Sequence, residues 1–143
     1  MNVAEVTRIL GGERTLGRRI RTTDDLRSAV EEGLPVAALI RVVAHMAGSD
    51  IAAAGLKYRI VPKATLHRRR GRLNLEESER LERLARITAL AEQVWEEEAL
   101  AHEFLRSAQP QLGGHAPLDL VRTDLGARQV EELLMKLEYG LPA

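Results

Sequence analysis

The sequence predicts an all-α fold, and three observations support this prediction. Residues that start and stop helices recur along the whole chain. Apolar residues recur at steps of three or four, the spacing of one helix face, and the clearest series is Leu81, Leu84, Ala85, Thr88, Ala91 and Trp95. No segment alternates apolar and polar residues as a half-buried strand would. With 143 residues, 45% of them hydrophobic, the chain is long enough to bury a core.

The first predicted helices lie in the N-terminal third of the chain. Thr23 precedes DDLRSAVEE and can cap that helix, and Gly33 is placed to end it. Pro35 suits the first turn of the next helix, VAALIRVVAHMA, which Gly48 closes. These signals predict short helices joined by tight turns.

Three short predicted helices follow one another in the pattern of a helix-turn-helix unit, over 36–47, 49–57 and 62–70. In such a unit the third helix lies in the major groove of DNA. If Leu66 faces the core, the 3.6-residue period of a helix makes Thr65 and Arg68 point outward. We expect these two residues to face base edges and the flanking cations to bind phosphates. We therefore expect a DNA-binding set of Lys63, Ala64, Thr65, His67, Arg68, Arg69 and Arg70. The alternative is a solvated basic surface, which charged runs usually are.

Charge is sorted along the chain although its formal net value is zero. Residues 51–75 carry seven Lys and Arg and no acid, whereas residues 76–143 carry seven basic and fourteen acidic residues. A basic segment indicates an anionic partner, and an acidic half indicates a different partner or serves solubility.

The C-terminal half predicts one long helical run followed by a loop and two helices. Asn74 with Glu77 has the spacing of a capping box before a run from Leu75 to about Phe104. After a loop rich in Pro and Gly, PLDLVRTDLGARQVEELLMKLEYG predicts one short and one longer helix, parted near Gly126. The longer helix places Val130, Leu133, Leu134 and Leu137 on one apolar stripe, which is more often core than interface.

Composition and missing motifs exclude several classes of protein. The chain has no cysteine, no apolar run near the ~20 residues of a membrane span and no apolar signal-peptide core at its start, so we expect a cytoplasmic protein without a membrane partner. The four histidines are widely spaced and form no ligand pair, which predicts no metal site. Neither a phosphate-binding loop nor a G-x-S-x-G elbow is present, so we expect no enzyme, no catalytic residue and no cofactor.

The segment LGGHAPLDLVRTDLGARQVEELLMKLEYG resembles the C-terminal toxin-binding domain of the Xre/MbcA/ParS antitoxins. The shared pattern is LGG, PL-x-L, GAR-x-V and a closing L-x-x-(I/L)-E-(Y/H)-G. Upstream, LGRRIRTTDDL, EEGLPVAAL, IVPKATLHRRRGRLNLEESERL and RLARITALAEQV resemble the Xre-type DNA-binding half of the same family. The resemblance covers nearly the whole chain and implies an Xre-like helix-turn-helix domain followed by a small helical toxin-binding domain.

The resemblance also implies a function in a type II toxin–antitoxin system. Such antitoxins pair with RES-domain toxins, which destroy NAD⁺, and block the toxin's active site with their C-terminal region. They also dimerise and repress their own operon. The DNA-reading helix then falls on Pro62–Arg70 and the blocking segment on Glu131–Ala143. The expected toxin-binding residues are Glu131, Lys136, Glu138, Tyr139, Gly140 and Leu141.

The expected domain organisation has four parts: an N-terminal arm and first helix at 1–28, the helix-turn-helix region at 29–74, a connecting helix at 75–99 and the toxin-binding domain at 100–143. The arm is a candidate for homodimerisation because nothing else explains its apolar Val3, Val6, Ile9 and Leu10. Acidic helices around 92–98 and 131–132 would complement a cationic NAD⁺ pocket and speed encounter with the toxin. The alternative function is a stand-alone helix-turn-helix transcription regulator with a ligand-sensing C-terminal half.

Overall fold

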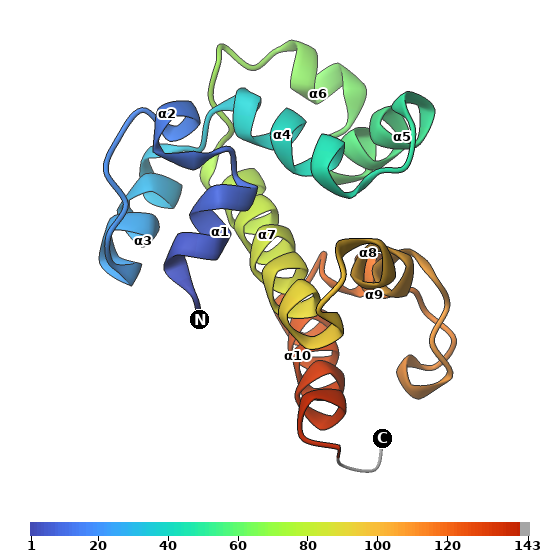
Figure 1. Cartoon of the computed structure of the whole chain (residues 1–143). Helices are drawn as coiled ribbons and strands as arrows, with labels where there is room; N and C mark the ends of the chain where they lie inside the picture. Colours follow the sequence, from blue (N-terminus) through green and yellow to red (C-terminus); the bar gives the residue numbers. More distant parts are fainter. Residues whose placement is uncertain (141–143) are drawn as a thin grey trace. The chain divides into compact units, whose positions relative to one another are not determined.

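The computed structural model describes residues 1–140, and these residues form helices and no strands (Figure 1). The predicted all-α class is confirmed. The elements are α1 (Val3–Ile9), α2 (Gly12–Leu16), α3 (Thr23–Glu32), α4 (Val36–Met46), α5 (Asp50–Ile60), α6 (Lys63–His67), α7 (Leu75–Trp95), α8 (Glu98–Arg106), the 3-10 turn η1 (Pro110–Leu112), α9 (Pro117–Leu120) and α10 (Asp124–Glu138). None of the helices within residues 1–140 has the length and apolar character needed to cross a membrane.

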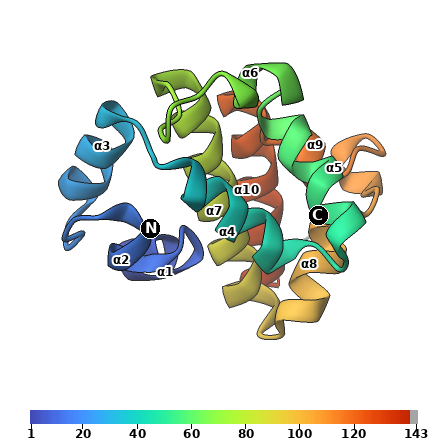
Figure 2. The same cartoon turned by 90° about the horizontal axis from the view of Figure 1, so that it is seen from above.

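The chain divides into two compact units, and α7 begins in the first and continues in the second. The first unit is Asn2–Ala85 and the second begins at Arg86. In the first unit α1 packs on α2, α3 and α4, and α5 lies along α4 (Figure 2). Its fully buried side chains are mostly aliphatic and come from several helices: Val6, Leu10, Leu34, Leu39, Val42, Met46, Val61 and Leu81.

The apolar residues of the N-terminal arm lie inside the core of the first unit. Val6, Ile9 and Leu10 are each at most 2% exposed, and Val3 is half-buried. These side chains therefore need no second chain to cover them. The sequence argument for a dimerisation arm depended on their being unexplained, so the structure removes its basis.

The N-cap of α3 is Thr22 and not the predicted Thr23. The Thr22 hydroxyl accepts from the Asp25 N–H, and the Asp25 carboxylate accepts from the N–H groups of Thr22 and Arg21 at 3.1 and 2.9 Å. Those two backbone donors lower the pKa of Asp25 below its ordinary value. The cap is shifted by one residue because a cap at Thr23 would place Leu26, which has no acceptor, where the box needs a carboxylate.

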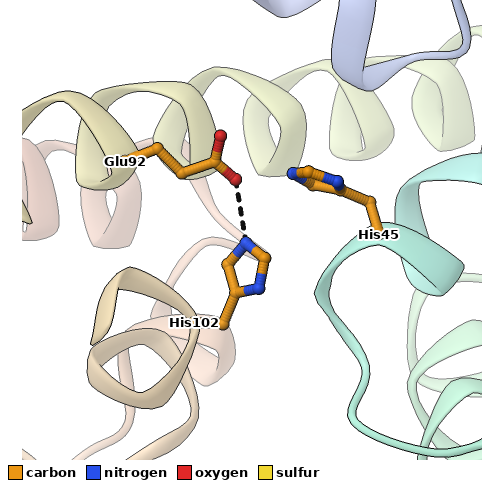
Figure 3. A group of neighbouring side chains, drawn as sticks. All are labelled: His45, Glu92 and His102. Atoms are coloured by element: carbon orange, nitrogen blue, oxygen red, sulfur yellow. Dashed lines mark hydrogen bonds and ion pairs between the residues drawn. The ribbon is translucent and has the colours of Figure 1, made fainter. Parts of the chain in front are cut away.

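The predicted helical run from Leu75 to Phe104 is broken at Glu96, where the backbone takes φ = 62°. This left-handed conformation is costly for a non-glycine residue, so packing must hold it. In the second unit the turn brings the Trp95 and Phe104 rings to a centroid distance of 5.7 Å. It also sets His102 Nε2 2.8 Å from Glu92 Oε2, a hydrogen bond drawn in Figure 3. A straight helix would carry α8 away from both contacts.

The last two helices part at residues 121–123 and not at Gly126, which lies in the first turn of α10. A Cβ built on Gly126 would overlap the carbonyl oxygen of Leu120 at the end of α9. Thr123 caps α10 by accepting from the Gly126 N–H at 3.0 Å. The glycine is therefore explained by close approach of α9 to α10, and the prediction took it for a helix breaker.

Candidate functional site

The predicted DNA-binding residues lie on α6 and in the three residues that follow it. α6 starts after Pro62 as predicted but has only five residues, none of them buried. Leu66, predicted to face the core, is only half-buried. The exposed members of the predicted set are Lys63, Ala64, His67, Arg68 and Arg70, whereas Thr65 and Arg69 are half-buried.

Arg69 forms a bidentate interaction with Glu77 in the first turn of α7. Its Nε and Nη2 donate to the two carboxylate oxygens, each at 2.8 Å. The same carboxylate accepts from the Asn74 N–H at 2.9 Å, and Asn74 Oδ1 accepts from the Glu77 N–H at 2.8 Å. This confirms the predicted capping box and adds a partner that sequence spacing did not indicate. Arg69 joins the α6 segment to α7, and the prediction had placed it among the cations that face phosphates.

The interaction changes the acid–base properties of both groups. Glu77 is only 3% exposed, yet the hydrogen bonds from Arg69 lower its pKa and outweigh the opposing effect of burial. The same hydrogen bond raises the pKa of Arg69. The carboxylate is therefore ionised at neutral pH although it is buried, because hydrogen-bond donors surround it.

Two further arginines anchor the turns around α6 to the body of the first unit. Arg80 Nη1 donates to the carbonyl oxygen of Ile60 at the end of α5, at 2.6 Å. Arg72 Nη1 donates to the carbonyl oxygen of Gly33 at 2.8 Å. Gly33 has φ = 97°, and a Cβ there would lie 2.5 Å from the Leu73 carbonyl oxygen. Arg69 and Arg72, two arginines of the basic segment 51–75, therefore hold the fold of the first unit together.

Of the Lys and Arg residues in the predicted DNA-binding set, Lys63, Arg68 and Arg70 are exposed, and none of these three forms an ion pair within residues 1–140. Arg68 Nη2 lies 3.4 Å from the Thr65 hydroxyl, so the two residues predicted to face bases are neighbours. Lys63 Nζ lies 5.9 Å from the centre of the Tyr58 ring. Exposed guanidinium and ammonium groups on a short helix can bind phosphate oxygens.

The second predicted surface lies on α10, whose inner face is buried by Val130, Leu133 and Leu134. Glu131 was predicted to contact a toxin, but its carboxylate accepts from Arg86 Nη1 on α7. The side chains of Arg86 and Glu131 are 28% and 30% exposed. Glu131 therefore holds α10 on α7.

The last turn of α10 leaves the core and exposes apolar and polar groups together. Leu137, predicted to continue the core stripe, is 38% exposed, Met135 is 40% exposed and Tyr139 is 68% exposed. The other predicted residues within the described part of the chain, Lys136, Glu138 and Gly140, are also exposed. Leu141 lies outside the described residues. Leu137 was expected in the core because its helical spacing is that of the predicted stripe, and no sequence pattern singled out Met135 as a surface group.

Comparison with known proteins assigns a family domain to each part of the chain. Residues 25–86 match the antitoxin Xre-like helix-turn-helix domain, and residues 90–140 match the antitoxin Xre/MbcA/ParS C-terminal toxin-binding domain. A curated relative from Pseudomonas putida, named Antitoxin Xre, is 38% identical over 84 residues. That match covers 57% of this chain and 53% of the relative, so it spans about half the length of each.

Proposed function

The chain belongs to the Xre/MbcA/ParS antitoxins, with both an Xre-like helix-turn-helix domain and a C-terminal toxin-binding domain, and on this premise we propose that it neutralises a toxin and represses transcription through two separate surfaces. One observation carries the proposal. The exposed cations around α6 and the exposed last turn of α10 belong to different compact units, and each unit contains most of one family domain.

The DNA-binding surface is the outer side of α6. Lys63 and Arg70 bind phosphates, and Ala64, Thr65 and Arg68 face base edges. His67 adds a polar group to the same surface. The DNA is the operator of the protein's own operon, bound by a homodimer at an inverted repeat, because two-fold protein symmetry matches repeated half-sites.

The toxin-binding surface is the end of α10 and the residues that follow. Met135, Leu137 and Tyr139 supply apolar area, while Lys136, Glu138 and the Gly140 backbone supply polar contacts, and Leu141 belongs to the same segment. Mixed aromatic and polar surfaces of this kind are typical of binding hot spots. The partner is a RES-domain toxin that degrades NAD⁺, and the segment occludes its active site. The protein is thus no enzyme and acts in the cytoplasm, where operator and toxin meet.

Two sets of substitutions test the separation of the two activities. Arg68→Gln with Arg70→Gln removes two exposed cations, and Met135→Ala with Tyr139→Ala removes two exposed groups from α10. We expect the first pair to weaken binding to the DNA upstream of the gene. The slope of log K against log salt concentration should become shallower by about 0.9 for each phosphate contact that is lost. We expect the second pair to lose protection against a co-expressed toxin from the neighbouring gene.

The outcome that opposes the proposal is loss of both activities in either double variant while its circular dichroism remains native. Co-purification with the neighbouring gene product separates the proposal from its rival. A stand-alone regulator would bind the upstream DNA and co-purify with no toxin.

A further inference from the structure

The orientation of α6 must be set from outside the helix itself. A five-residue helix is too short to be stable alone, and α6 buries none of its residues. Its position therefore depends on contacts made by the segments that flank it. On the C-terminal side these contacts converge on one buried group, the Glu77 carboxylate.

Glu77 is itself held rigidly. Its backbone N–H and one of its carboxylate oxygens are both engaged with Asn74, which fixes the side chain in one rotamer at the start of α7. The neighbouring Ser78 accepts from the Leu34 N–H at 2.8 Å, and this anchors the same turn to the core. A fixed carboxylate that receives a planar guanidinium through two parallel hydrogen bonds defines both the distance and the direction of that guanidinium.

We propose that Glu77 is a positioning residue for DNA recognition, which acts by holding Arg69 and so fixes the direction of α6 and of the exposed Arg68 and Arg70 on either side of Arg69. This inference rests on the proposed DNA binding. Glu77 does not touch DNA in this account, and Arg69 contributes through Glu77. The family resemblance placed Arg69 in the reading helix, whereas the geometry assigns it to support.

The sign of one substitution separates this role from simple electrostatics. Glu77→Gln keeps the size of the side chain but removes a negative charge next to a cation-rich surface. If charge alone mattered, DNA binding would become tighter, since the Arg69 charge would be released. If Glu77 positions α6, the upstream DNA should bind about tenfold more weakly or worse, the loss expected when one base-reading arginine is misplaced. Glu76→Gln is the matched control, because Glu76 is 81% exposed in the same turn.

Arg69 variants complete the test with the full-length protein. Arg69→Lys keeps the charge but cannot form two parallel hydrogen bonds to the Glu77 carboxylate, so it should weaken DNA binding nearly as much as Arg69→Gln. The double variant Arg69→Gln with Glu77→Gln should lose about as much affinity as either single variant, because both changes remove one interaction. Wild-type affinity in Arg69→Lys, or tighter binding in Glu77→Gln, overturns the proposal. Additive losses in the double variant overturn it as well.

A measurement without DNA keeps the inference distinct from the proposed function. Amide hydrogen exchange in residues 63–70 should accelerate in Glu77→Gln and Arg69→Lys and remain unchanged in Glu76→Gln, while exchange in α10 stays at its wild-type rate. Unchanged exchange in residues 63–70 of both variants contradicts the positioning role. If the wild-type protein bound no upstream DNA, the proposed function would fail, and the exchange result would still decide whether Glu77 holds α6.

Discussion

Gly126 provides the sharpest test of the packing in the second unit, because sequence and structure predict opposite effects for Gly126→Ala. The residue lies in a helix, where replacing glycine by alanine ordinarily stabilises by about 1 kcal/mol. The structure leaves no room for the added methyl group, which would overlap the Leu120 carbonyl oxygen and lie 3.0 Å from Thr123 Oγ1. A backbone oxygen cannot rotate away, so α9 and α10 must separate.

The magnitude follows from these two opposing contributions. Overpacking costs roughly 1–3 kcal/mol, and overlap with backbone puts this site at the upper end of that range. After the gain in helix propensity is subtracted, we expect Gly126→Ala to lower the free energy of unfolding by about 2 kcal/mol. Gly55→Ala is the matched control, because Gly55 lies in α5 with nothing within 4 Å of its Cβ position. That change should stabilise by about 0.5–1 kcal/mol.

Urea unfolding of the full chain measures both effects, with circular dichroism as the common signal. Trp95 is the only tryptophan in the sequence and contacts Phe104, so its fluorescence reports on the second unit. If Gly126→Ala unfolded at the same urea concentration as wild type or higher, the reasoning from close approach of α9 to α10 would be wrong. Equal destabilisation by Gly55→Ala would show that alanine is harmful for another reason.

Three further predictions use matched substitutions or pH. Thr22→Ala should cost about 1 kcal/mol of unfolding free energy by removing the α3 cap, whereas Thr23→Ala should stay within about 0.5 kcal/mol; the reverse order would restore the cap predicted from sequence. Leu134→Ala should cost about 2–5 kcal/mol because Leu134 is fully buried, whereas Leu137→Ala should leave stability nearly unchanged and weaken toxin binding in a pull-down, and a large stability loss at 137 would contradict its exposure. Because hydrogen bonds from Arg69 lower the pKa of Glu77, the ionised carboxylate contributes stability that is fully present above about pH 4.3 and is lost as pH falls through the lower folded value. The unfolding free-energy difference between wild type and Glu77→Gln should therefore shrink below about pH 4.3, and a difference that grew with acidity would exclude this role.

The sequence by itself determined the fold class and most helices, and it indicated the two family domains that the comparisons support. A cap such as Asn74 acts within three residues, so its signal is local and can be read from the sequence, and the structure confirms it. The period of apolar residues likewise identified the buried side of α10 at Val130, Leu133 and Leu134. The motifs of the C-terminal segment indicated the family that the comparisons support.

The tertiary structure decided what each charged or small residue does in space. Arg69 and Arg70 are adjacent and chemically identical, yet one binds a buried carboxylate and the other faces solvent. The periodic stripe of α10 continues to Leu137, but the core ends before it, and sequence periodicity carries no information about where a neighbouring helix stops. Glu96 takes a left-handed conformation, and Gly126 lies against the carbonyl oxygen of Leu120, six residues away in sequence but on another helix. Each of these outcomes depends on which groups folding brings together, and the local sequence pattern does not specify those contacts.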